Sequence, residues 1–88
     1  PSAFSLSQNY QNPINPLTAI RFQVKGNSNV SIKIFDINGR EVQTLVNEKL
    51  QSGMYQTNWD ASAYPSGVYF YRMMTDGYSE TKKMTLLR

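Results

Sequence analysis

The chain has 88 residues, a length that fits a single domain with one modest hydrophobic core. It contains no cysteine, which excludes a disulfide framework, and no histidine, which removes the commonest general base and metal ligand. Its nine lysines and arginines exceed its six acids by +3 but are dispersed, so we expect no nucleic-acid partner. No apolar run approaches the ~20 residues that span a membrane, so we expect no membrane span.

Apolar and polar residues alternate with a period of two, and turn residues interrupt the pattern every ~8–12 positions. We expect a short edge strand at Phe4-Ser5-Leu6, followed by strands over 18–24 and 29–36. The pair Asn38-Gly39 then predicts a hairpin with a type I′ turn, because both residues tolerate the positive φ that this turn requires.

The segment 40–47 is less regular, because Val42 and Leu45 stand at positions of opposite parity. A strand with a bulge, a strand with one half-buried face and a short helix all remain open. We favour a strand, since only about eight residues separate two turns.

The second half of the chain continues the pattern. A strand is expected over 54–60, a connecting loop over 61–67 and a strand over 68–74 that is apolar on both faces, as in the centre of a sheet. Asp76-Gly77 predicts a second tight hairpin, leading into a last strand over 78–87. The spacing therefore predicts an all-β chain, an antiparallel Ig-like β-sandwich of about seven strands.

The chain offers little for catalysis. Three of its acids, Asp36, Asp60 and Asp76, stand at strand ends or turns, where aspartate commonly accepts hydrogen bonds from backbone amides. Glu41 and Glu80 lie on strands beside basic residues, and we expect solvated ion pairs. No pair of groups suits general acid–base work, so the chain is predicted not to be an enzyme, and we expect no cofactor. Of the acids, Asp60 is the least implausible ligand for a calcium ion, but no calcium-loop pattern is present.

The aromatic residues have two interpretations. Trp59, at the end of an alternating strand, is expected to anchor the core. Tyr69 and Tyr71 share one face of a strand, where they either stack on a sugar ring or pack against neighbouring elements. Packing is the favoured interpretation.

Four stretches of the chain match a known pattern in the same order: SQNYQNPINP at 7–16, VSIKIFDINGREV at 30–42, the region 53–72, and KKMTLLR at 82–88. Together they resemble the type A C-terminal sorting domain of the type IX (Por) secretion system of Bacteroidetes and related bacteria. Two residues depart from the family pattern, Gln11 where proline is usual and Ile14 where phenylalanine is usual. The positions that carry the family motifs are Asn12, Pro13, Asn15, Pro16, Gly39, Arg40, Gly67 and Tyr69.

The resemblance implies a folded sorting signal. A passenger fused to its N-terminus would pass through the periplasm, be recognised by the outer-membrane translocon, and reach the cell surface or the medium. A sortase-like surface peptidase would usually remove the domain by cleavage near or before Pro1. We expect one domain in two parts, a motif segment with a short edge strand at 1–17 and a sandwich body at 18–88, at the end of a longer protein.

The physical hypothesis for the signal concerns the last strand. A receptor can pair with an exposed strand edge through main-chain groups, and alternate side chains then supply specificity. Alternation places Met84 and Leu86 on one face, and Lys83 and Leu87 on the other. The predicted recognition residues are Lys82, Lys83, Met84, Leu86, Leu87 and Arg88.

Two alternatives remain open. One is an accessory carbohydrate-binding module of a secreted glycoside hydrolase that contacts sugar through Tyr69, Tyr71 or Tyr78. The other is the Ig-like part of a flagellar hook-capping protein, which has a similar Trp-Asp and Ser-Gly-Val-Tyr pattern but usually a longer loop after Trp-Asp.

Overall fold

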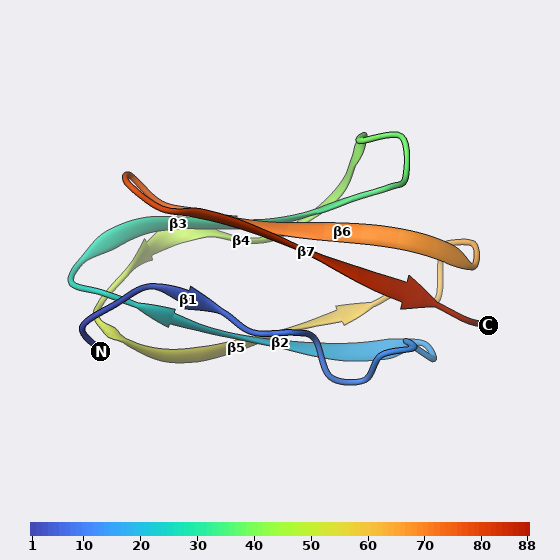
Figure 1. Cartoon of the computed structure of the whole chain (residues 1–88), viewed down its shortest axis with the longest axis horizontal. Coiled ribbons are helices and arrows are strands. Elements are labelled where there is room, and N and C mark those ends of the chain that lie inside the picture. Colours follow the sequence, from blue (N-terminus) through green and yellow to red (C-terminus); the bar gives the residue numbers. More distant parts are fainter.

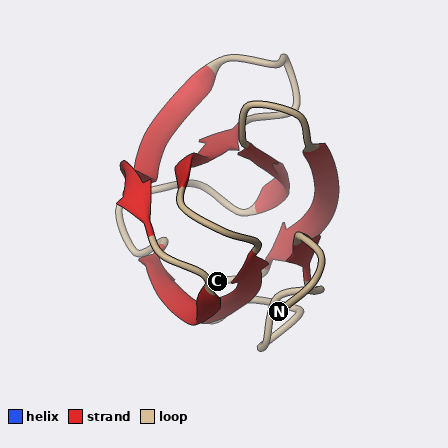
Figure 2. Ribbon diagram, turned by 90° about the vertical axis from the view of Figure 1, so that its left-hand side faces the viewer, coloured by secondary structure: helices blue, strands red, loops and turns tan.

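A computed structural model describes residues 1–88 and contains seven strands and no helix (Figures 1 and 2). The all-β prediction is therefore confirmed, including the short strand near the N-terminus and the strand, rather than helix, in the region 40–47. The strands are β1 (Ser5–Leu6), β2 (Leu17–Val24), β3 (Ser28–Phe35), β4 (Glu41–Leu50), β5 (Gly53–Asp60), β6 (Gly67–Met74) and β7 (Ser79–Leu86).

The strands form two antiparallel sheets that face each other, as Figure 1 shows. One sheet has the order β1-β2-β5 and the other the order β4-β3-β6-β7. Hairpins join β3 to β4 and β6 to β7 within one sheet, whereas the connections β2–β3, β4–β5 and β5–β6 pass between the sheets. This is the layered arrangement expected of an Ig-like sandwich, and β6 is central as predicted.

Alternation along the strands builds the core. Ile20, Phe22 and Val24 of β2 point inward and are buried, as are the alternating apolar residues of β3. Trp59 is fully buried, its ring lies 5.3 Å from that of Tyr69, and its Nε1 donates a 3.0 Å hydrogen bond to Gln43 Oε1. The prediction that Trp59 anchors the core is confirmed.

Strand β4 contains two irregularities in its pairing with β3. Ile32 pairs with Val46 and the next residue of β3 pairs with Thr44, so Leu45 is an extra residue. A second shift, between Ile34 and Phe35, leaves Val42 extra in the same way. Of the alternatives left open for this segment, the bulged strand is the one that the structure shows, and the bulges account for the opposite parity of these two apolar residues.

The β3–β4 turn differs from the predicted type I′ turn. Gly39 has a φ of +82°, but no non-glycine residue has positive φ, so the prediction is wrong at Asn38. The Asp36 carboxylate is the physical reason: its Oδ1 accepts hydrogen bonds from the amides of Asn38 at 2.9 Å and Arg40 at 3.0 Å. These bonds hold a wider turn with one left-handed position, and they lower the pKa of Asp36, the Arg40 amide bond contributing most.

Candidate functional site

The N-terminal motif covers part of the outer edge of β7. This strand is the last in its sheet, so on one side it has no neighbouring strand. The segment 8–14 runs along that side and occupies the outward main-chain groups near the end of β7. Four hydrogen bonds join the two segments: Gln8 Nε2 to Lys83 O at 2.8 Å, Thr85 N to Asn12 Oδ1 at 3.1 Å, Ile14 N to Thr85 O at 2.7 Å, and Leu87 N to Ile14 O at 3.1 Å.

Ile14 fixes this contact from inside the sandwich. Its backbone forms a parallel bridge with Leu86, and its side chain is fully buried in the core cluster. An isoleucine at this motif position therefore still fills the core with an apolar side chain, although phenylalanine is usual in the family.

The same N-terminal segment is also attached to the opposite sheet. Tyr10 and Ala19 of β2 exchange backbone hydrogen bonds, and the buried Asn9 donates from Nδ2 to Thr18 Oγ1 at 2.8 Å and to Gln11 O at 2.9 Å. Because it bonds to both sheets, the motif segment closes one side of the sandwich. The sequence interpretation missed the role of Asn9, for which its place in the opening motif was the available signal.

The predicted recognition residues of β7 divide into two sets. Met84 and Leu86 are fully buried, whereas Lys83 and Leu87 are exposed, as alternation predicted. Lys82 is half-buried and forms a 3.1 Å ion pair with Glu80. In the folded domain Lys83 and Leu87 are therefore exposed to solvent, while Met84 and Leu86 pack in the core.

Arg88 is engaged within the domain. Its Nη1 donates to Ser62 O at 2.6 Å and to Tyr64 O at 2.5 Å, and its backbone N–H donates to Ser66 Oγ at 3.0 Å. The residue thus joins the end of the chain to the β5–β6 loop.

Most of the family motif residues lie at one end of the sandwich, on the right in Figure 1. There the motif segment approaches the β5–β6 loop, since Ala61 N donates to Pro16 O at 2.9 Å. We call this region the motif end and define it by residues 11–16, 36–40, 61–67 and 87–88. It includes Asn12, Pro13, Asn15, Pro16, Gly39, Arg40 and Gly67, whereas Tyr69 lies beneath it, buried, with its Oη donating to Pro65 O at 2.7 Å.

A family model described as the secretion system C-terminal sorting domain matches residues 8–86. The chain belongs to this family. No curated protein matches the chain, and neither does any solved structure. The resemblance noted in the sequence is thereby confirmed: this is a C-terminal sorting domain of the type IX secretion system, a family of export signals that are not catalytic.

The geometry of the sorting domain decides between the two interpretations of Tyr69 and Tyr71. Tyr69 is 4% exposed and Tyr71 is fully buried, so the favoured packing interpretation is confirmed and these two rings do not form the alternative, a sugar-stacking face. Tyr71 Oη donates a 2.6 Å hydrogen bond to Ser7 O, and burial raises the pKa of Tyr71 to about 12. Tyr78 is half-buried, with its ring stacked on Phe4 at 5.4 Å.

Asp60 and Glu41 of the sorting domain make the contacts that the sequence predicted for them. Asp60 accepts a 3.0 Å hydrogen bond from Ser62 N, and the pKa of Asp60 is lowered by its bonds to the Ser62 side chain and backbone. Glu41 pairs with Lys33 at 3.3 Å. The structure shows no group of three or more metal-binding side chains, and it contains no helix long and apolar enough to cross a membrane.

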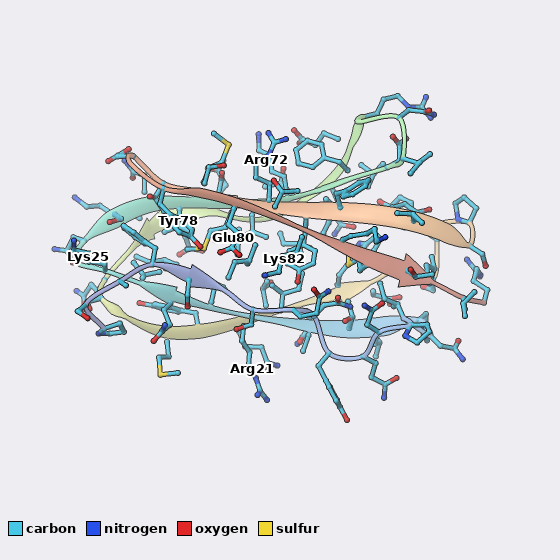
Figure 3. The ribbon with its side chains drawn as sticks, viewed as in Figure 1. Arg21, Lys25, Arg72, Tyr78, Glu80 and Lys82 are labelled. Atoms are coloured by element: carbon cyan, nitrogen blue, oxygen red, sulfur yellow. The ribbon has the colours of Figure 1, made fainter.

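Tyr78, just before β7, and Glu80 and Lys82 of β7 point toward the opposite sheet (Figure 3). The Tyr78 hydroxyl donates a hydrogen bond to the Glu80 carboxylate, which also forms an ion pair with the Lys82 ammonium group. Burial, followed by the bond to Glu80, raises the pKa of Tyr78 to about 12. These groups satisfy one another, so the start of β7 carries polar side chains directed inward.

Proposed function

We propose that the type IX translocon recognises the motif end of the folded sorting domain, together with the exposed face of β7, and so exports the passenger fused to its N-terminus. The observation that carries the proposal is the hydrogen bonding of segment 8–14 to the end of β7. It brings the two halves of the family motif, which are separated by most of the chain, into one surface.

The chemistry of this surface supports recognition by a polar partner. Asn12 and Asn15 are exposed beside the prolines of the motif, Lys83 projects from the neighbouring strand β7, and Leu87 is exposed just after that strand. The guanidinium groups at the motif end are each bonded to acceptors within the domain. Such a surface combines amide groups, one ammonium group and one apolar contact, and it suits a partner with acceptors and an apolar recess.

The geometry also supports a signal that requires folding. Ile14 and Leu86 meet only when both sheets are formed, so an unfolded chain would not present the composite surface. The expected division into 1–17 and 18–88 becomes, in this proposal, one domain whose N-terminal segment completes the surface on the body. The passenger would then pass through the periplasm and reach the cell surface or the medium, where a sortase-like peptidase would cleave before the domain.

The test uses export of a fused reporter by a bacterium that has the type IX system. Two variants change exposed side chains at the proposed surface: Leu87→Ser at the motif end and Lys83→Glu on the neighbouring strand β7. The control, Lys25→Glu, changes an exposed lysine in the β2–β3 turn at the opposite end of the sandwich. We expect each of the first two variants to reduce the exported reporter by about tenfold, a loss of ~1.4 kcal/mol in binding. Lys25→Glu should leave export unchanged.

Thermal unfolding of each purified variant separates recognition from folding. Deleting residues 84–88 would not do so, because it removes two fully buried side chains, Met84 and Leu86. Normal export of a Lys83→Glu, Leu87→Ser double variant would overturn the proposal, and so would an equal loss from Lys25→Glu in domains that remain folded.

A further inference from the structure

The sandwich has four strand edges, and three of them are protected against pairing with another chain. Exposed edges carry unpaired N–H and C=O groups, and proteins block them with short strands, bulges, charges or covering segments. Strand β1 has only two residues, and β4 contains two bulges and also carries charged residues such as Glu48 and Lys49. Strand β7 is covered at one end by segment 8–14 and carries the inward ion pair of Glu80 and Lys82 at the other.

Strand β5 has none of these devices. It extends over the eight residues Gly53–Asp60, contains no proline, and pairs with β2 without a register shift. Its one charged residue, Asp60, stands at the very end of the strand. The side of β5 away from β2 has no strand neighbour.

The hydrogen bonds of β2 identify which groups of β5 are free. Ala19 and Arg21 bond toward the N-terminal segment, so the alternate residues of β2, including Ile20 and Phe22, bond toward β5. Their partners on β5 are therefore the odd-numbered residues. The main-chain groups of the even-numbered residues, Met54, Gln56 and Asn58, consequently point away from β2, into solvent.

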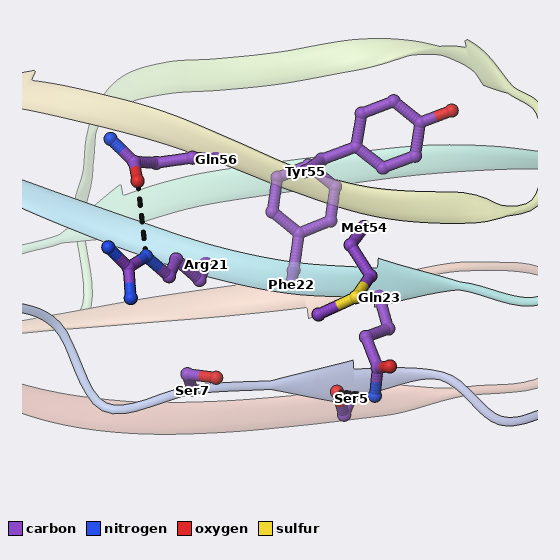
Figure 4. Close-up of a pocket in the computed structure, with 8 residues that line it drawn as sticks. All are labelled: Ser5, Ser7, Arg21, Phe22, Gln23, Met54, Tyr55 and Gln56. Atoms are coloured by element: carbon purple, nitrogen blue, oxygen red, sulfur yellow. Dashed lines mark hydrogen bonds between the residues drawn. The ribbon is translucent and has the colours of Figure 1, made fainter. Parts of the chain in front are cut away.

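The side chains of these residues form an uncharged strip. Met54 is 79% exposed, and Gln56 and Asn58 are exposed on the outer face of the sheet. Figure 4 shows Met54 and Gln56 beside a shallow groove on this face, where Gln56 Oε1 accepts a 3.2 Å hydrogen bond from Arg21 Nε. On the inner side, Tyr55 is half-buried and stacked on Phe22 at 5.5 Å.

We propose that β5 pairs antiparallel with β5 of a second copy of this chain, around a two-fold axis at Gln56. The free main-chain groups fall on alternate residues symmetric about Gln56, so the strand is complementary to itself and forms about six interchain hydrogen bonds. The two three-stranded sheets become one six-stranded sheet.

The side-chain pairs created by this axis are all compatible. Met54 lies opposite Asn58 of the second copy, and Gln56 lies opposite Gln56. On the inner face Tyr55 lies opposite Thr57 of the second copy, and an aromatic residue beside a β-branched one is a favourable antiparallel pair. No like charges meet across the paired segments, because residues 53–59 carry no charge.

The dimer is expected to be transient. One strand edge buries less than the ~1,200 Å² of stable interfaces, and each copy carries a charge of +3 that opposes association. Because β5 runs along the side of the sandwich, each motif end stays open in the dimer (Figure 1). Pairing would therefore bring two sorting domains together without covering the surface proposed for the translocon, and its test does not depend on that proposal.

The test is sedimentation velocity of the 88-residue chain from about 10 µM to about 1 mM, a range that covers weak dissociation constants. We expect the weight-average mass to rise toward that of a dimer. Added salt should strengthen association, since it screens the repulsion between two positively charged copies. Association through ion pairs of β4 or β7 would instead weaken with salt.

Two proline variants identify the edge. Gln56→Pro removes an N–H that points into solvent, so it costs the monomer no main-chain hydrogen bond but blocks pairing at the axis. Thr81→Pro is the matched control, because the Thr81 N–H points away from β6 on the outer side of β7. We expect the first variant to raise the dissociation constant at least about tenfold and the second to leave it unchanged.

A second substitution at Gln56 tests the same pairing without a proline, in case Gln56→Pro fails to fold. Gln56→Glu can keep the hydrogen bond from Arg21 but places two carboxylates opposite each other, so it should weaken the dimer most at low salt. The proposal is overturned if the chain stays monomeric throughout the range, if a folded Gln56→Pro variant still dimerises, or if only Thr81→Pro abolishes the dimer.

Discussion

Replacing Ile14 by alanine tests whether the N-terminal motif is an integral part of the sorting domain. The side chain is fully buried, and its backbone donates to Thr85 and accepts from Leu87. Alanine would leave a cavity between the motif segment and β7, at the point where the two halves of the motif meet. We expect the N-terminal segment to lose the packing of this side chain in the core and so to be held less firmly against the last strand.

The size of the effect follows from the burial. Truncating a fully buried isoleucine to alanine costs about 2–5 kcal/mol, and we expect about 3 kcal/mol here. A domain of this length is stable by about 4–13 kcal/mol, so the loss is a large fraction of the free energy of unfolding. With an m-value of about 1 kcal/mol/M in urea, the unfolding midpoint should fall by about 3 M.

The assay is urea unfolding followed by the fluorescence of Trp59, which is fully buried in the folded domain. Leu17→Ala is the matched control, since Leu17 lies close by in sequence but is 57% exposed, and it should change stability by less than about 0.5 kcal/mol. A loss below about 1 kcal/mol for Ile14→Ala would refute the reasoning, because the motif segment would then contribute little to the fold.

Three further outcomes are expected. Above pH 10 the unfolded chain loses the phenolic proton that Tyr71 retains in the folded domain, since burial raises the pKa of Tyr71 to about 12. The urea concentration at the unfolding midpoint should therefore fall between pH 10 and pH 12. The fall should be smaller in Tyr71→Phe. Gly39→Ala should cost about 1–2 kcal/mol in thermal unfolding because φ is +82°, whereas Gly77→Ala, without positive φ, should cost less; equal losses would contradict this. Arg88→Ala should raise amide hydrogen exchange across 62–66, with a global loss below about 1 kcal/mol.

The sequence predicted the elements well because a period of two is a local property of the chain. Ile20, Phe22 and Val24 face the core, and the opposite parity of Val42 and Leu45 marked the bulged strand. The amide bonds of Asp36 and Asp60 at strand ends were also predictable, since such a carboxylate bonds amides a few residues further along the chain. One prediction was wrong, the type I′ turn at Asn38-Gly39. The hydrogen bonds that the Asp36 carboxylate accepts outweigh the tendency of Asn38 to adopt a positive φ.

The sequence could not show which of two apolar faces is covered. Tyr69 and Tyr71 share parity with each other, but whether that face is exposed or buried depends on the opposite sheet, and here both are buried. Likewise, alternation placed Lys83 and Leu87 on one face of β7 without showing that their main chain is bonded to the N-terminal segment.

The last strand, β7, shows which properties follow from the sequence and which depend on the tertiary structure. Its alternation, with Lys83 on the face opposite to that of Met84 and Leu86, follows from the sequence, because it depends on residues next to one another in the chain. The environment of its outer edge does not follow from the sequence. Thr85 forms hydrogen bonds with Asn12 and Ile14, which lie close to it only when the two sheets pack on a common core. The tertiary structure alone therefore decided that the N-terminal and C-terminal motifs form one surface, and that the open edge of the sandwich is β5.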